Sequence, residues 1–203
     1  MKLIYYGHSC FNLVSNDFSI VFDPYKDESV PGLVCPNIEC DTLLISHEHD
    51  DHNCREKCKL ISPQRKINID KINVPHDKCN GILRGMNYIH KINVDGITIA
   101  HLGDIGTLNE DVMNFLKDAD VILCPINGFY TIGYLEAIAI LNRIKPKLFI
   151  PMHYWDNETG YFDNNQIILF KNTIQDFISL DKNEIEIENY LLDESKVLIF
   201  ERR

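Results

Sequence analysis

The segment TLLISHEHDDH (residues 42–52) joins a short apolar run directly to a dense group of histidine and acidic residues. The apolar run has the length and composition of a buried β-strand. A solvated acidic loop that happens to contain histidines is the alternative, but this density after a buried strand favours a metal site. His47 and His49 lie two positions apart on an extended chain and point to the same side, whereas Asp51 and His52 are adjacent and diverge. We therefore expect this segment to supply ligands to two metal ions.

Five other apolar runs also end at a histidine or an aspartate, namely His8, Asp23, His76, Asp104 and His153. If these strands run in the same direction, their polar ends meet at one edge, where sheet proteins tend to place their sites. Imidazole and carboxylate groups are ligands for zinc, manganese and iron. Two such ions about 3.5–4 Å apart can hold a hydroxide and stabilise an attacked phosphorus or carbonyl oxygen. We predict two divalent ions, with zinc as the first choice and manganese or iron as alternatives, held by His47, His49, Asp51, His52, His76, Asp104 and His153.

Two further histidines allow more than one interpretation. His101 precedes Asp104 by three residues, and it either ligates a metal ion or supports Asp104 from behind. His8 either packs in the core, supports the ligands or contacts the substrate. We assign catalytic roles to Asp51, His8 and His101, with Asp51 orienting the attacking hydroxide and His8 contacting the substrate or steadying the leaving group. Aromatic residues after the late strands either line the mouth of the site or serve as packing: Phe129, Tyr130, Tyr134, Tyr154 and Trp155.

The order of the predicted elements indicates an α+β protein. Short strands separated by turn residues fill the first part of the chain, and later strands alternate with helices expected at 109–119, 133–145 and 165–178. This mixture indicates sheets covered by helices and not a purely parallel sheet. Because no repeat and no linker-like run interrupts the sequence, we expect one domain over residues 1–203.

Composition narrows the classes of partner. The 203 residues carry a net charge of −10, which disfavours nucleic acid because a phosphate backbone requires a basic field. No apolar segment approaches the roughly 20 residues that cross a bilayer. The seven cysteines are scattered and odd in number, which indicates free thiols and a cytoplasmic protein. We expect a small-molecule substrate, and nothing in the sequence indicates an oligomeric state.

Four motifs together resemble those of the metallo-β-lactamase superfamily. SHEHDDH (46–52) matches its signature His-x-His-x-Asp-His, and three later segments resemble further motifs in the expected order: HDKCNGILRGMN (76–87), AHLGD (100–104) and PMHY (151–154). The resemblance covers nearly the whole chain. The most similar subgroup is the bacterial metal-dependent hydrolases that begin with a Gly-His-Ser stretch, with ascorbate-6-phosphate lactonase and ribonuclease Z among the relatives.

The resemblance implies a four-layer αββα sandwich with the site at one rim. By motif, His47, His49 and His76 hold the first metal ion, Asp51, His52 and His153 hold the second, and Asp104 bridges them. His101 then supports the site from behind, although it remains an alternative to His76. In this family, an aspartate at position 104 indicates a phosphodiesterase-like or lactonase-like hydrolase. The chain departs from the family pattern at Asn127, where a glycine pair is expected. The alternatives are a di-iron redox or gas-sensing protein on the same fold, and a binding module that retains metal without catalysis.

Overall fold

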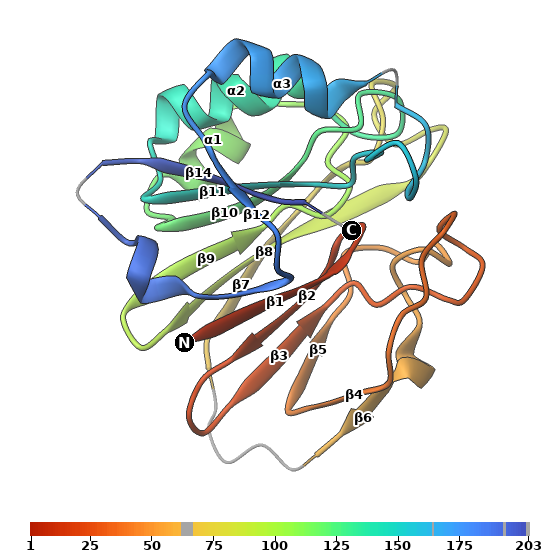
Figure 1. The fold of residues 1–203 in the computed structure, drawn as a ribbon. Coiled ribbons are helices and arrows are strands. Elements are labelled where there is room, and N and C mark those ends of the chain that lie inside the picture. Colours follow the sequence, from red (N-terminus) through yellow and green to blue (C-terminus); the bar gives the residue numbers. More distant parts are fainter. Residues whose placement is uncertain (62–66, 164, 193, 202–203) are drawn as a thin grey trace.

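Two β-sheets pack face to face and enclose an apolar core in the computed structural model (Figure 1). Residues from both sheets fill this core, for example Leu13 and Phe22 from one sheet and Leu123 and Ile150 from the other. The predicted α+β sandwich is confirmed by this arrangement. The structure describes residues 1–61, 67–163, 165–192 and 194–201.

The first sheet has five strands in the order β13-β1-β2-β3-β5. They are β1 (Lys2–Gly7), β2 (Cys10–Val14), β3 (Ser19–Phe22), β5 (Thr42–Leu44) and β13 (Glu184–Glu186). Strands β1 and β3 are both antiparallel to β2, and β5 is parallel to β3. Therefore β1, β3 and β5 run in the same direction, and the residues that follow them, including His8 and Asp23, emerge at one edge.

The second sheet has seven strands in the order β12-β14-β11-β10-β9-β8-β7. They are β7 (Ile69–Pro75), β8 (Met86–Val94), β9 (Ile97–His101), β10 (Val121–Pro125), β11 (Leu148–Met152), β12 (Ile178–Leu180) and β14 (Lys196–Phe200). Because β8 is antiparallel to both β7 and β9, and β9, β10 and β11 are parallel, β7, β9 and β11 run in the same direction. His76, Asp104 and His153 follow these three strands. The common strand direction on which the predicted convergence depends is thus present in each sheet.

Three helices cover the outer face of the seven-stranded sheet (Figure 1). They are α1 (Glu110–Leu116), α2 (Tyr134–Ile144) and α3 (Gln166–Ile174). Asn109 caps α1 by accepting the Val112 N–H at 2.9 Å, as the sequence predicts. The helix expected at 165–178 ends early because Gln175 adopts a left-handed conformation, and the following residues form β12 beside β14. No helix within the described part of the chain is long and apolar enough to cross a membrane.

An irregular layer covers the outer face of the five-stranded sheet. It consists of the chain between β3 and β5, which includes β4 (Ile38–Cys40), together with β6 (Cys58–Leu60), which pairs with β4. The 3₁₀ turn η1 (Arg55–Lys57) directly precedes β6. Prolines at positions 24, 31 and 36 disfavour a helix between β3 and β5, and an apolar cluster around Tyr25 and Cys35 anchors this segment to the sheet.

Candidate metal centre

The seven predicted ligands converge at the rim where the two sheets present the ends of their parallel strands. Among the described residues, the ligand atoms form three groups, and the atoms inside each group lie within 4.8 Å of one another. The groups are His47, His49 and His76; His47, His52 and Asp104; and His8, Asp51, His52 and His153. Asp104 lies at the centre, with its Oδ2 atom 3.1 Å from His153 Nε2, 3.3 Å from His52 Nε2 and 3.5 Å from His76 Nε2. This position is the one expected of a carboxylate that serves both halves of the site.

Unpartnered polar atoms inside the cluster test whether these residues fit metal ions. Among the described residues, the following buried atoms that face the cluster have no partner with hydrogen-bond geometry: His47 Nε2, His52 Nε2, His153 Nε2 and Asp104 Oδ1. An unsatisfied buried polar atom costs about 1–3 kcal/mol, so several of them at one place require a ligand. Burial lowers the pKa of His47 to about 3, which leaves its imidazole neutral at neutral pH, the state that binds metal. The donor set therefore fits divalent cations.

A buried aspartate sets the orientation of two of the histidines. Asp23 accepts hydrogen bonds from Ser46 N–H (2.7 Å), Ser46 Oγ–H (2.6 Å) and His52 Nδ1–H (2.9 Å). Because the Ser46 hydroxyl donates its proton to Asp23, it accepts the Nδ1–H of His47 at 2.9 Å. Both histidines consequently direct Nε2 lone pairs into the cluster. The position of Asp23 at a strand end is visible in the sequence, but no local pattern indicates this supporting role.

We expect Asp23→Asn to weaken metal binding about 10–100-fold, the usual effect of removing a carboxylate that supports a ligating histidine. Asparagine cannot accept all three hydrogen bonds in the same way, so the His47 and His52 rings lose their fixed orientation. Metal dissociation constants measured by competition with a chelator report the effect. Asp41→Asn is the matched control, because Asp41 bonds Ser19 at the opposite end of β3. Unchanged affinity in Asp23→Asn would contradict the assignment.

His8 lies within the group of predicted ligands, and its side chain is buried. Its Nε2 atom is 3.2 Å from Asp51 Oδ2, its ring centroid is 3.9 Å from that of His153, and its side chain is 1% exposed. The His8 carbonyl also accepts the His153 N–H at 2.9 Å, which ties the two sheets together at the site. His8 therefore contacts Asp51 directly, and the contact with a substrate considered from the sequence stays a prediction.

His101 lies outside the three ligand groups. Its Nδ1 atom accepts the Gly103 N–H at 3.2 Å, so Nε2 carries the proton and donates to the Ser9 carbonyl at 2.9 Å. Its ring stacks on Phe22 with centroids 4.9 Å apart. Both nitrogens are occupied by backbone groups, so the structure places His76 and not His101 beside His47. The catalytic role assigned to His101 from the sequence has no support in this position, which is that of a structural residue.

A cavity of about 280 Å³ opens over the ligands. It is lined by His49, Asp51, His76, Arg84, Asp104, Tyr130 and Tyr161. The Tyr161 ring lies 5.6 Å from that of His8, and its hydroxyl donates to the Ser29 carbonyl. Neither Arg84 nor Tyr161 was identified from the sequence as a cavity residue. Arg84 lies within the segment HDKCNGILRGMN (76–87), whose importance was assigned to His76, and Tyr161 lies on a loop without a recognisable motif.

Of the aromatic residues considered from the sequence, Tyr130 lies in the wall of the metal cavity and Tyr154 lies in the apolar core. Tyr130 lines the cavity, and Asn127 Oδ1 positions it by accepting the N–H groups of Phe129 and Tyr130 at 3.2 and 3.0 Å. Asn127, which departs from the expected glycine pair, thus holds the turn that carries the cavity wall. Tyr154 is buried and its hydroxyl donates to the Phe200 carbonyl at 2.7 Å, so it serves as packing.

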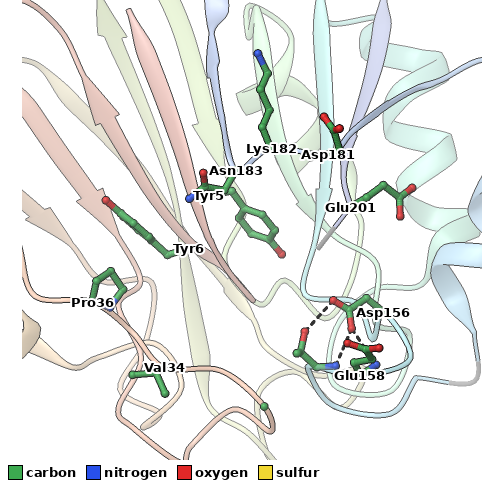
Figure 2. Close-up of a pocket in the computed structure, with 12 residues that line it drawn as sticks. Tyr5, Tyr6, Val34, Pro36, Asp156, Glu158, Asp181, Lys182, Asn183 and Glu201 are labelled. Carbon is green, nitrogen blue, oxygen red and sulfur yellow. Dashed lines mark hydrogen bonds between the residues drawn. The ribbon is translucent and has the colours of Figure 1, made fainter. Parts of the chain in front are cut away.

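A larger cavity of about 480 Å³ lies elsewhere (Figure 2). Tyr6, Val34 and residues of the loop at 156–159 line it, and none of its described lining residues is a predicted metal ligand. Asp156 in this wall is occupied by its own loop, since it accepts the Glu158 N–H and the Thr159 N–H and Oγ–H. This larger cavity is therefore separate from the predicted metal ligands.

Known proteins share this sequence pattern and this fold. Residues 2–153, more than half of the chain, match the family described as the beta-lactamase superfamily domain. A UPF0173 metal-dependent hydrolase of Thermoplasma acidophilum is 25% identical and covers 93% of this chain and 98% of its own. A counterpart of the same name from Natranaerobius thermophilus is 26% identical and covers 76% and 83%.

A solved structure from Thermotoga maritima, described as a candidate zinc-dependent hydrolase of the metallo-beta-lactamase superfamily, gives the same result in three dimensions. It has a TM-score of 0.76 and 27% identity, and covers 100% of this chain and 99% of its own. The matched family and the shared arrangement of sheets agree. The chain therefore belongs to the beta-lactamase superfamily and has the metallo-β-lactamase fold.

Proposed function

We propose that this protein is a metal-dependent hydrolase that uses a dinuclear centre to cleave a phosphodiester, a lactone or a related ester of a small molecule. The observation that supports this most directly is the gathering of unpartnered histidine nitrogens around Asp104 beneath an open cavity. In this proposal the ligands divide as the motifs imply: His47, His49 and His76 for one ion, Asp51, His52 and His153 for the other, and Asp104 for both.

When bound, two divalent ions lower the pKa of a water molecule and polarise the attacked oxygen. The chain contributes position and proton transfer. Asp51 lines the cavity, and His8 holds its Oδ2 atom at 3.2 Å, so the carboxylate has a fixed orientation from which it can accept a proton from the attacking water. The Tyr130 and Tyr161 rings wall the cavity and limit the access of bulk water.

The relatives and the surface support the class of metal and substrate. Two relatives are named metal-dependent hydrolases, and the Thermotoga maritima protein is described as a candidate zinc-dependent hydrolase, which favours zinc. The cavity volume of about 280 Å³ suits a small molecule. The net charge of −10 disfavours nucleic acid as a substrate.

Elemental analysis of the purified protein, combined with a panel of phosphodiesters, lactones and thioesters, tests the proposal. We expect two equivalents of a divalent metal per chain and turnover of at least one class in the panel. Iron with redox-active absorbance would favour the di-iron alternative. Two bound ions without any turnover would favour a non-catalytic binding module, and a chain that binds no divalent ion would contradict both.

A further inference from the structure

The loop at 77–85 has a fixed conformation at the edge of the metal cavity. The buried carboxylate of Asp77 accepts four backbone N–H groups at 2.7–3.0 Å, those of Cys79, Gly81, Leu83 and Arg84. The Gly85 carbonyl accepts the His76 N–H at 3.1 Å, which connects the loop to a predicted metal ligand. Gly81 and Gly85 both have φ of +80°, and a Cβ on Gly81 would lie 2.7 Å from the Gly85 carbonyl oxygen. This loop is therefore held in one shape relative to the cavity.

Arg84 extends from this loop into the wall of the metal cavity. Its side chain also lines two adjoining hollows of about 190 and 330 Å³. The guanidinium lies over the rings of Tyr130 and Phe129, with distances of 5.1 and 5.6 Å to their centroids. These rings cover one face of the guanidinium and leave its in-plane N–H donors as the groups that can bind an anion.

No carboxylate among the described residues pairs with Arg84, whereas several other cations, including one in the same loop, have acidic partners. Lys78 in the same loop lies 3.4 Å from Glu136, and Arg143 pairs with Glu110. Two carboxylates, those of Asp51 and Asp104, share the cavity with Arg84, and both are assigned to the metal ions. In a chain with a net charge of −10, a half-buried guanidinium without an acidic partner beside the metal ligands is well placed to bind an anion from outside.

We propose that Arg84 binds a carboxylate or phosphate group of the substrate that is separate from the bond being cleaved. The natural substrate is then an anionic ester, and Arg84 determines this specificity. The proposal rests on the hydrolase function given above. The fixed loop and the ring-covered guanidinium reduce the entropy lost on binding, which favours recognition by this arginine over a mobile surface lysine.

Two chromogenic esters with the same leaving group test the proposal: p-nitrophenyl butyrate, and mono-p-nitrophenyl glutarate, which has a free carboxylate. We expect the wild-type protein to prefer the anionic ester about tenfold in kcat/KM, mainly through KM, and Arg84→Gln to abolish that preference. Arg84→Lys should retain part of it. Lys78→Gln makes the same charge change in the same loop, outside the metal cavity, and should leave the preference intact. A wild-type protein without preference, or an Arg84→Gln variant that keeps it, would overturn the proposal.

A binding measurement decides the role of Arg84 even if no ester is hydrolysed. Calorimetry on the metal-loaded protein compares butyrate with glutarate and with phosphonobutyrate, each of which adds a second anionic group. One or both should bind about tenfold more tightly than butyrate, and Arg84→Gln should remove the gain. Gain with glutarate alone indicates a carboxylate as the recognised group, and gain with phosphonobutyrate alone indicates a phosphate. Absence of gain with both would overturn the proposal, whereas a gain without turnover would contradict only the hydrolase function.

Discussion

Asp51→Ala is expected to abolish ester hydrolysis, with kcat reduced by at least about a thousandfold, while the chain still folds. Asp51 is both a predicted ligand and the carboxylate that receives a proton from the attacking water, so its loss removes two contributions at once. Its side chain is 15% exposed, and its contacts are with His8 and His52 at the site, not with the apolar core. The measurement is kcat on activated esters with saturating metal, together with circular dichroism and a thermal melt.

Asp50→Asn is the matched control for this prediction. Asp50 is the neighbouring residue, its side chain is 71% exposed, and it pairs with Lys26 at 2.7 Å on the surface. This variant should hydrolyse esters at the wild-type rate, because an exposed ion pair contributes little. Asp51→Asn retains the shape of the side chain and separates loss of charge from loss of volume. Wild-type turnover in metal-loaded Asp51→Ala would exclude the mechanism.

Removal of the metal ions is expected to lower Tm by about 10 °C or more. A ligand present at a thousand times its Kd stabilises the folded state by about 4 kcal/mol, and each kcal/mol corresponds to about 2–4 °C in a chain of this size. The physical reason lies in the buried atoms of the cluster, such as His47 Nε2 and Asp104 Oδ1, which have no hydrogen-bond partner among the described residues. Thermal melts before chelation, after it and after zinc is restored give the measurement.

Two results distinguish a metal effect from a general effect of the chelator. Restored zinc should recover the original Tm, and Asp23→Asn should gain less from the same zinc concentration because its affinity is lower. An unchanged Tm after chelation, with metal loss verified by elemental analysis, would show that the cluster is stable without cations and would contradict the predicted effect.

Local sequence was sufficient for the half of the site that lies in one segment. His47, His49, Asp51 and His52 fall within one six-residue span (47–52) that follows β5, so their separation along the chain limits their separation in space. Apolar patterns likewise predicted the longer strands of both sheets, and the helical period predicted all three helices. Four short strands were missed, namely β4, β6, β12 and β13. Unlike β5, which lies in a longer apolar run, each of them is interrupted or flanked by polar residues and depends on a partner strand.

The roles of the remaining residues depended on contacts between distant segments. From the sequence, either His76 or His101 could be the third ligand beside His47 and His49. The Ser9 carbonyl and the Gly103 N–H, both from distant or turning backbone, occupy the two His101 nitrogens, and His76 lies beside His47. Asp23 acquires its role only where β3 lies beside β5.

Sequence alone determined which residues can bind metal, because ligand chemistry belongs to the side chain and strand ends follow from local patterns. The tertiary structure decided which nitrogen of each histidine is free and which loops enclose the cavity. Both depend on packing between the two sheets. The same packing brings Arg84, without an acidic partner among the described residues, to the metal ligands, and no local pattern records that contact.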